Sequence, residues 1–342
     1  MTGYIGGDPY SSPTFGKSLS LRVDGGFNAV SINPSGRDVV LASRKGLYIV
    51  DLDDPFSEPR WLHHITSWEV ADVQWCPHPA KHHWVISTSN QKAIVWNLSR
   101  SSSKAVEHVL HGHFRAITDI NFHPLQPEIL ATSSIDTYAL AWDMRSPKKP
   151  YYRTSNWRSG AAQVKWNHKN SNVLATSHSN ILYIWDVRKG TTPLSVLKGH
   201  EGSINSIDFN TFNESEIMSS GNDASVRFWD YNNVGHELQW TITTDFPVWR
   251  GRYLPFGDGY CIMPMSGGNN SVYLASALHD PIDLEPQTSK LQATYVFKGH
   301  TDRVTDFLWR SRHSYNTTVY DREFQLVTWS KDCDLKLWPV PE

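Results

Sequence analysis

The sequence has little cysteine, no long apolar segment and almost no net charge. None of its three cysteines, Cys76, Cys261 and Cys333, forms a Cys-x-x-Cys pair, so we expect a reducing compartment and no disulfide framework. No run approaches the roughly 18 apolar residues of a membrane span, and no signal peptide follows Met1. With 32 basic and 34 acidic residues among 342, no global positive field indicates a nucleic-acid partner.

Side chains that bind metals or phosphates occur without the partners that such sites need. The pair His63-His64, and His78 with His82-His83, would supply at most two ligands from one strand-turn segment, which does not make a closed metal site. The stretches Gly257-Asp258-Gly259 and Gly267-Gly268 have no phosphate-loop lysine and no following helix, so they are interpreted as turns. We therefore expect no metal, no cofactor and no enzymatic activity.

Three copies of one pattern organise the chain. Each opens with Gly-His, passes an Asp six residues before a Trp, and closes on that Trp at 142, 229 and 338. At a period of about 40–45 residues this is the signature of a β-propeller blade. The corresponding closing positions, separated by 46, 46, 43, 44, 45 and 64 residues, are Val50, Trp96, Trp142, Trp185, Trp229, Leu274 and Trp338. Seven closings predict an all-β, seven-bladed WD-repeat propeller, and the long last step predicts insertions.

The two ends of the chain are expected to meet. Residues 1–18 are rich in Gly, Ser, Pro and Tyr without periodicity and are interpreted as a mobile lead-in. Residues 19–23 then alternate like a strand but have no partner in the first blade. We expect this strand to pair with the one that ends at Trp338, because closing the ring removes its exposed edges. The propeller then spans 19–342.

Each complete blade is expected to contain a buried polar network of His, a strand hydroxyl, the turn Asp and the closing Trp. A Ser/His/Asp set invites a hydrolase interpretation, but it recurs once per complete blade, whereas a nucleophile occurs once, in a cleft. We therefore interpret the sets as structural. They are His113, Ser134, Asp136 and Trp142; His200, Ser220 or Ser219, Asp223 and Trp229; and His300, Ser330, Asp332 and Trp338.

The remaining candidates for function lie on the surface. Residues that enter the inner strands form a ring at the channel mouth, and exposed aromatic and arginine side chains there are typical interface anchors. This set comprises Trp68, Arg115, Phe246 and Arg303, with Trp249 expected to pack between blades instead. Two insertions, 276–290 and 311–324, are predicted on the opposite face as partner-docking loops, although ordinary variable loops are an equal alternative. Their candidate residues are Asp280, Asp283, Tyr315 and Tyr320.

Several stretches are more specific than the repeat. They include Gln163–Asn167, Leu174–His178 and, in the degenerate sixth blade, Pro247–Phe256. With them go Tyr48–Leu52, Thr132–Tyr138 and Leu326–Asp332. Together they resemble the WD-repeat protein fifty-nine family, the Mtc-five/Sea-three-type subunits of the SEA complex, called GATOR-two in animals. Members are longer, so the resemblance implies that this chain is their N-terminal propeller.

The resemblance implies a scaffold in a coat-like assembly on the vacuolar or lysosomal membrane, which the chain would reach through partners. The assembly regulates amino-acid signalling to the target-of-rapamycin kinase complex. The implied partners are small nuclear-pore-related and COPII-related propellers, other WD-repeat subunits, and the GTPase-activating complex directed at Rag-type GTPases.

A different class of function stays open. Trp142-Asp143-Met144-Arg145 and Trp185-Asp186-Val187-Arg188 resemble the Trp-Asp-x-Arg motif with which substrate receptors of cullin-RING ubiquitin ligases bind their adaptor. In that case Arg145 and Arg188 would be the adaptor-binding residues. The favoured interpretation is a closing Trp-Asp followed by a solvated arginine, because the motif is loose.

Overall fold

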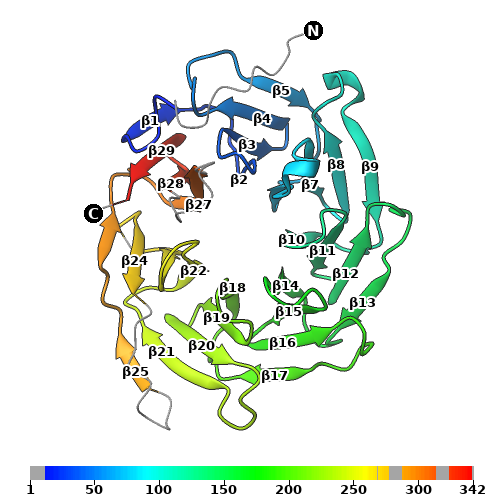
Figure 1. Cartoon of the computed structure of the whole chain (residues 1–342), viewed down its shortest axis with the longest axis vertical. Helices are drawn as coiled ribbons and strands as arrows, with labels where there is room; N and C mark the ends of the chain where they lie inside the picture. The colour runs from blue at the N-terminus through cyan, green and yellow to red at the C-terminus, as the bar shows by residue number, and fades with distance from the viewer. Residues whose placement is uncertain (1–11, 268, 277–286, 313–322, 341–342) are drawn as a thin grey trace, which may run out of the picture.

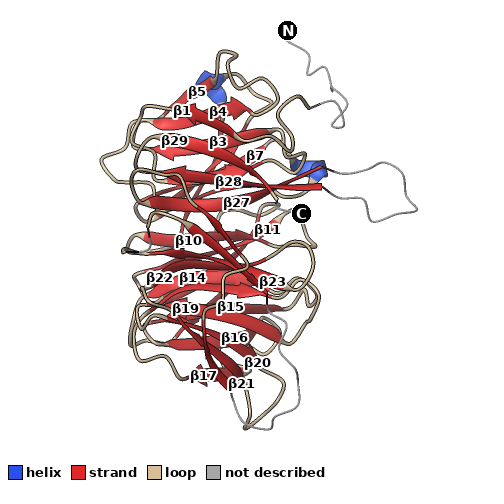
Figure 2. Ribbon diagram, turned by 90° about the vertical axis from the view of Figure 1, so that its left-hand side faces the viewer, coloured by secondary structure: helices blue, strands red, loops and turns tan. Residues whose placement is uncertain are grey.

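The computed structural model describes residues 12–267, 269–276, 287–312 and 323–340. Within them, seven β-sheets stand radially around a central channel, as Figure 1 shows along the channel axis and Figure 2 from the side. Each sheet runs from an inner strand at the channel to an outer strand at the rim. Six sheets have four strands and one has five. This confirms the predicted all-β, seven-bladed propeller.

The first four blades follow the chain in order, and all their neighbouring strands are antiparallel. Blade one contains β2 (Ala29–Ile32), β3 (Asp38–Ser43), β4 (Gly46–Asp51) and β5 (Arg60–His63). Blade two contains β6 (Val73–Trp75), β7 (Trp84–Ser89), β8 (Lys92–Asn97) and β9 (Val106–His111), with the 3₁₀ turns η2 (Pro79–Lys81) and η3 (Ser102–Lys104) in its loops. Blade three contains β10 (Ile117–Phe122), β11 (Ile129–Ser134), β12 (Tyr138–Asp143) and β13 (Tyr152–Ser155). Blade four contains β14 (Ala161–Trp166), β15 (Val173–His178), β16 (Ile181–Asp186) and β17 (Ser195–Lys198).

The last three blades depart from this regular order. Blade five contains β18 (Ile204–Phe209), β19 (Glu216–Gly221), β20 (Ser225–Asp230), β21 (Leu238–Thr243) and, from far along the chain, β25 (Gln287–Lys290). Blade six contains β22 (Val248–Tyr253), β23 (Gly259–Pro264), β24 (Val272–Ser276) and β26 (Tyr295–Phe297). Blade seven contains β27 (Val304–Arg312), β28 (Glu323–Ser330), β29 (Asp334–Pro339) and, as its outer strand, β1 (Leu19–Arg22).

The ring closes through the start of the chain. Strand β1 pairs antiparallel with β29, from Leu19 opposite Leu337 to Arg22 opposite Asp334. The indole of Trp329 adds a hydrogen bond of 2.9 Å to the carbonyl oxygen of Phe27, which joins blade seven to the connection between β1 and β2 that leads into blade one. The predicted closure is confirmed, and it leaves β29 without an exposed edge.

The core is divided among the blade interfaces. Seven apolar clusters of buried residues lie between neighbouring sheets, including one between blades seven and one. The closing tryptophans Trp142, Trp185 and Trp229 are among the largest fully buried side chains. Burying an indole removes about 150 Å² or more from water, which stabilises the fold by roughly 4 kcal/mol per residue.

A recurring bulge shapes the channel. In the inner strands of blades three to seven, the register with the second strand shifts across the second residue. Four of the residues directly after the bulge, Asp119, Gln163, Arg250 and Asp306, line the central cavity. Bulges re-aim side chains, and here they accompany the polar lining of the channel.

Two segments expected to be loops contribute strand residues. The insertion after β24 ends in β25, which pairs parallel with the outer strand of blade five, Gln287 opposite Trp240. The hairpin of blade seven is longer than in other blades, because Ser311 and Arg312 pair with Phe324 and Glu323. Asp280, Asp283, Tyr315 and Tyr320 lie outside the described residues.

Part of the segment predicted as a mobile lead-in makes defined contacts. The guanidinium of Arg310, 2% exposed in the whole side chain, donates to Thr14 at 3.1 Å, to Ser12 at 3.1 Å and to Asp53 at 2.6 Å. The Gln325 amide donates to the carbonyl oxygen of Lys17 at 2.8 Å. Residues 12–17 are therefore tied to blades one and seven by buried polar groups.

Candidate functional site: polar networks, channel and exposed faces

The polar network of blade three links four side chains in series. The imidazole Nδ1 of His113 lies 3.0 Å from Asp136, and Nε2 lies 2.8 Å from the Thr132 hydroxyl. The Trp142 indole donates to the same hydroxyl at 3.0 Å. Since the indole can only donate, a fully satisfied chain has the hydroxyl donating to Nε2 and Nδ1–H donating to the carboxylate. The structure places Thr132, not Ser134, between histidine and tryptophan.

Blades five and seven repeat this arrangement. In blade five the linking hydroxyl is that of Ser219, 2.7 Å from His200 and 2.8 Å from the Trp229 indole, whereas the buried hydroxyl of Ser220 has no partner in the described structure. In blade seven it is that of Thr328, 2.7 Å from His300 and 2.8 Å from the indole nitrogen of Trp338.

The serines assigned to this link serve the turn instead. Ser134 donates to the carbonyl oxygen of Arg115 at 3.0 Å and accepts from the backbone N–H of Asp136. Ser330 does the same between Asp302 and Asp332. The prediction that Ser134 and Ser330 link histidine to tryptophan is therefore wrong; Thr132 and Thr328 form these links.

Blades two and four have the tryptophan and the hydroxyl without the Gly-His opening. Trp96 donates to Ser87 at 3.0 Å, and Trp185 donates to Thr176 at 2.8 Å. In blade four the imidazole comes from the second strand itself, where Nε2 of His178 lies 3.0 Å from Thr176. Sequence reasoning missed these groups, although a Ser or Thr stands nine or ten residues before each of the five closing tryptophans.

The networks hold charge but expose no reactive group. Burial alone would raise the pKa of Asp223, but hydrogen bonds from His200 and Ser225 lower it to about 2. The pKa values of Asp136 and Asp332 are lowered in the same way. The imidazoles of His113, His200 and His300 are almost fully buried. The sets therefore fix the geometry of each blade.

The channel contains a cavity of about 460 Å³ whose charged walls are largely paired. Lys165 lies 2.8 Å from Asp119, and Arg252 lies 2.9 Å from Asp306. Burial raises the pKa of the Asp72 carboxyl, and the negative charge of neighbouring Asp119 raises it further. Within the described residues, no group of three or more His, Cys, Asp or Glu side chains could hold a metal ion.

The same carboxylates join neighbouring blades. Asp72 accepts a hydrogen bond of 2.9 Å from the backbone N–H of Ile120, and Asp119 accepts one of 3.0 Å from that of Val164. The Gln163 amide oxygen continues the series to blade five at 2.9 Å. The polar lining therefore connects inner strands that share no sheet.

The predicted ring at the channel mouth divides into exposed and buried members. Trp68 is 57% exposed, and Arg115 is exposed. Phe246 is only 8% exposed and packs on Tyr273 with ring centroids 5.0 Å apart. Arg303 is exposed beside the central cavity. Trp249 packs against the cluster between blades six and seven, as expected.

Sequence reasoning missed an apolar patch on the same face. We call it the blade-three patch; it consists of Phe114 in the loop between β9 and β10, Ile135 in the loop between β11 and β12, and Trp157 in the loop between β13 and β14. Phe114 and Trp157 are 77% and 76% exposed. The backbone N–H of Phe114 donates to Asp136, directly after Ile135, and the Cα of Ile135 lies against Gly160 of the third loop. The sequence did contain a signal for this patch, because large apolar residues are unusual in turns rich in Gly, Ser and Asp.

Trp157 occupies an unfavourable backbone conformation. Its φ is 62°, in the left-handed region, which costs a residue with a Cβ roughly 1 kcal/mol. The Asn156 side chain holds the turn by accepting from the backbone N–H groups of Arg158 and Ser159. The Trp157 ring meets the Tyr138 ring edge-on, with ring centroids 5.5 Å apart. The loop therefore presents a large indole to solvent despite a local cost.

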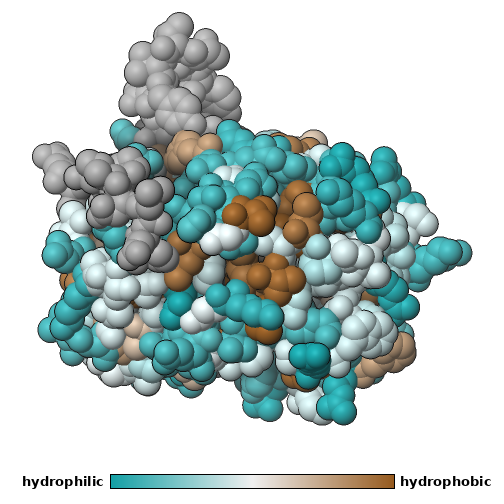
Figure 3. All heavy atoms as spheres, turned by 90° about the horizontal axis from the view of Figure 1, so that it is seen from below, coloured by the Kyte–Doolittle hydropathy of each residue, from teal (hydrophilic) through white to brown (hydrophobic). Residues whose placement is uncertain are grey.

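The rim has apolar residues of a more ordinary kind. Figure 3 views the rim at blades four and five, where apolar side chains gather among polar ones. The outer strands of several blades expose such residues, for example Val109 in β9, Val196 in β17 and Tyr295 in β26. This exposure follows from their position as outer strands and singles out no site.

The two arginines of the Trp-Asp-x-Arg motifs bind the aspartate two residues earlier. Arg145 lies 2.6 Å from Asp143, and Arg188 lies 2.7 Å from Asp186, each through two guanidinium nitrogens. Both arginine side chains remain mostly solvent-exposed. These contacts shape the turns after β12 and β16.

Comparisons with known proteins agree with the geometry. Residues 104–143 and 191–230 match the family described as WD domain, G-beta repeat. A chain of the solved structure entitled "Crystal Structure of Mitotic Checkpoint Complex" superposes with a TM-score of 0.74 over 95% of this chain and 91% of that one, at 16% identity, which shows the fold alone. The protein is a WD-repeat propeller.

Sequence relatives narrow the class. Maintenance of telomere capping protein 5 of Saccharomyces cerevisiae is 68% identical over 342 residues, 100% of this chain and 30% of that protein. GATOR2 complex protein WDR59 of Homo sapiens is 36% identical over 316 residues, 91% of this chain and 30% of that protein. The chain belongs to the family of these two proteins and spans about 30% of their length. No helix in its described part is long and apolar enough to cross a membrane.

Proposed function

We propose that this propeller is a non-catalytic docking scaffold of a SEA/GATOR2-type complex, with the blade-three patch as its main docking surface. The carrying observation is that Phe114 and Trp157 are about three-quarters exposed on one face, with the Trp157 loop built at a local backbone cost. Large aromatic residues are the commonest energetic anchors of interfaces. The charged pairs of the channel, such as Lys165 with Asp119 and Arg252 with Asp306, are bound to each other instead.

The surroundings of the patch favour an acidic face on the partner. Arg115 and Arg158 are exposed on the same two loops as Phe114 and Trp157, and neither has an ion pair among the described residues. Asp136, the nearby acid, is almost buried and hydrogen-bonded to His113. Exposed cations around an apolar centre raise association rates with acidic surfaces. Trp68 and Arg303 extend the surface toward the channel mouth.

The partners and location come from the family. A complex of this type would contain other WD-repeat subunits and small nuclear-pore-related and COPII-related propellers. It would act at the vacuolar or lysosomal membrane, reached through partners, in amino-acid signalling to the target-of-rapamycin kinase complex. The Rag-directed GTPase-activating complex is a further expected partner. A second docking region on the opposite face stays a proposal from the sequence. Its candidate residues, which lie outside the described residues, are Asp280, Asp283, Tyr315 and Tyr320.

The test is affinity purification of the tagged protein at its native level, followed by mass spectrometry. The double variant Phe114→Ala/Trp157→Ala should lose complex subunits, whereas Phe56→Ala, which removes an aromatic that is 80% exposed in the loop between β4 and β5 on the opposite face, should not. Equal recovery of every subunit with both variants would contradict docking through this patch.

The same purification distinguishes the scaffold function from that of a cullin-RING substrate receptor. The double variant Arg145→Ala/Arg188→Ala should leave the complex intact, because both arginines are bound to their own blade's aspartates. Recovery of a cullin adaptor by the unmodified protein, and its loss with this variant, would favour a ligase receptor instead.

A further inference from the structure

A small cavity opens between blades five and six, on the face opposite the blade-three patch. Its volume is about 140 Å³, and it lies among the loop after β18, the start of β19, strands β20 and β21, and the loop after β22. A water molecule's share of liquid volume is about 30 Å³, and pockets for drug-sized ligands begin near 300 Å³. The cavity therefore fits one side-chain head group rather than a whole ligand.

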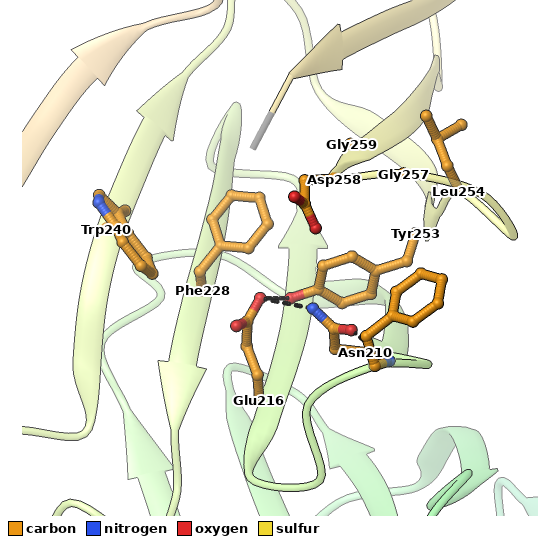
Figure 4. A pocket seen from close by; sticks show the side chains of 10 residues that line it. Asn210, Glu216, Phe228, Trp240, Tyr253, Leu254, Gly257, Asp258 and Gly259 are labelled. Carbon is orange, nitrogen blue, oxygen red and sulfur yellow. Dashed lines mark hydrogen bonds between the residues drawn. The ribbon is translucent and has the colours of Figure 1, made fainter. Parts of the chain in front are cut away.

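Aromatic rings form the walls of this cavity. The rings of Phe228 and Tyr253 meet at 6.0 Å with an interplanar angle of 66°, and Trp240 meets Phe228 at 6.2 Å and 87°. Phe228 and Tyr253 are almost fully buried, so these walls are held by the core, and Phe212 is an exposed aromatic at the edge. Figure 4 shows the Phe228 and Tyr253 rings next to each other, with the Asp258 carboxylate pointing toward them.

Two carboxylates complete the enclosure. Glu216 accepts hydrogen bonds from the Tyr253 hydroxyl at 2.6 Å and from the Asn210 amide at 3.1 Å, both at Oε1. Within the described part of the chain, its Oε2 has only a long contact of 3.5 Å from the Asn213 amide. Asp258 points into the same space and has no hydrogen bond or ion pair within the described residues. The donors to Glu216 are neutral, so its charge is not compensated.

Among the described residues, no basic side chain lines the cavity. Its lining residues are Asn210, Phe212, Glu216, Phe228, Trp240, Tyr253, Leu254, Gly257, Asp258 and Gly259. A site with two carboxylates and no cation is complementary to a positive charge, and aromatic faces attract cations through their quadrupole. Anionic ligands are excluded by the same charges.

We propose that this cavity binds the cationic head of a lysine or arginine side chain, N-methylated lysine included. The alkyl stem would lie along Phe228 and Tyr253, and the head group would lie between Asp258 and Glu216. Trp240 and the edge-on ring packing hold Phe228 in place and act as positioning groups. The site lies away from the blade-three patch, so it stands or falls independently of the docking function.

The test is fluorescence-polarisation binding of labelled, end-blocked five-residue peptides to the chain. The central residue is lysine, trimethyl-lysine, arginine or norleucine, and norleucine is the neutral control. Binding of the cationic peptides should exceed that of the norleucine peptide by roughly tenfold, the size of a partly desolvated cation–π and charge contact. Unlabelled lysine amide and arginine amide, used as competitors, show whether a free amino acid or only a peptide is taken.

Two variants locate the binding without disturbing the core. Asp258→Asn removes the exposed carboxylate and should weaken binding of the cationic peptides about fivefold to tenfold. Glu201→Gln removes the same charge from an exposed position in the loop after β17, outside the cavity, and should leave binding unchanged. Equal binding of the norleucine peptide, equal binding by Asp258→Asn, or no saturation up to about 1 mM peptide would overturn the proposal.

Discussion

The hydroxyl of Thr132 should matter more for stability than that of Ser134, although both are fully buried two residues apart. Thr132→Val keeps the shape of the side chain but removes the group that joins His113 and Trp142. The histidine nitrogen and the indole N–H then lose their partner in the core. Each buried polar group left without a partner costs about 1–3 kcal/mol, so we expect a loss of about 2–4 kcal/mol in the free energy of unfolding.

The matched control is Ser134→Ala, which removes two part-buried hydrogen bonds at the turn, to the Arg115 carbonyl oxygen and from the Asp136 backbone N–H. Water can reach part-buried groups and replace these bonds, so we expect a smaller loss of about 1–2 kcal/mol. Urea denaturation followed by tryptophan fluorescence compares the two variants. Adding Trp142→Phe to Thr132→Val should cost less than the two single changes summed, because one hydrogen bond is lost in both. A Thr132→Val variant no less stable than Ser134→Ala would refute the assignment of the network.

Three further predictions concern buried charges. The pKa of Asp223 falls from its usual 3.8 to about 2 on folding. Ionised Asp223 therefore stabilises the fold above pH 4 by roughly 2 kcal/mol, and this stabilisation is lost as the pH falls toward 2. Asp223→Asn should flatten acid unfolding between pH 4 and 2, and an unchanged slope would contradict this. The pKa of Asp72 is raised by burial and by Asp119, so the ionised carboxylate weakens the fold as the pH rises through its folded pKa. Asp72→Asn, whose amide oxygen can still accept from Ile120, should raise the melting temperature at pH 7; a decrease would argue against the raised pKa. Arg310→Met leaves Asp53 without its cation and removes the donors to Ser12 and Thr14. It should lower the free energy of unfolding by about 3 kcal/mol in urea and expose residues 12–17 to limited proteolysis, and protease resistance equal to the unmodified chain would refute this anchoring.

The repeat made most of the fold predictable. Strand alternation, turn residues and closing tryptophans are local signals, and together they predict seven blades and the pairing of residues 19–23 with the last strand. The fifth strand of blade five was not predictable in this way. The segment Gln287–Lys290 has no apolar alternation, and its pairing with β21 depends on which edge its loop reaches.

The sequence by itself determined the number of blades, the closure of the ring and the recurrence of the polar sets, because a period and an alternation are written in neighbouring residues. Only the tertiary structure decided which hydroxyl completes each set. Thr132 and Ser134 lie on the same face of β11, so strand alternation cannot distinguish them. The position of the Trp142 indole on the neighbouring strand distinguishes them, because its N–H reaches the Thr132 hydroxyl. Likewise, the blade-three patch and the cavity between blades five and six gather residues from separate loops and blades. Their aromatic and charged side chains act together only because ring closure places those segments side by side.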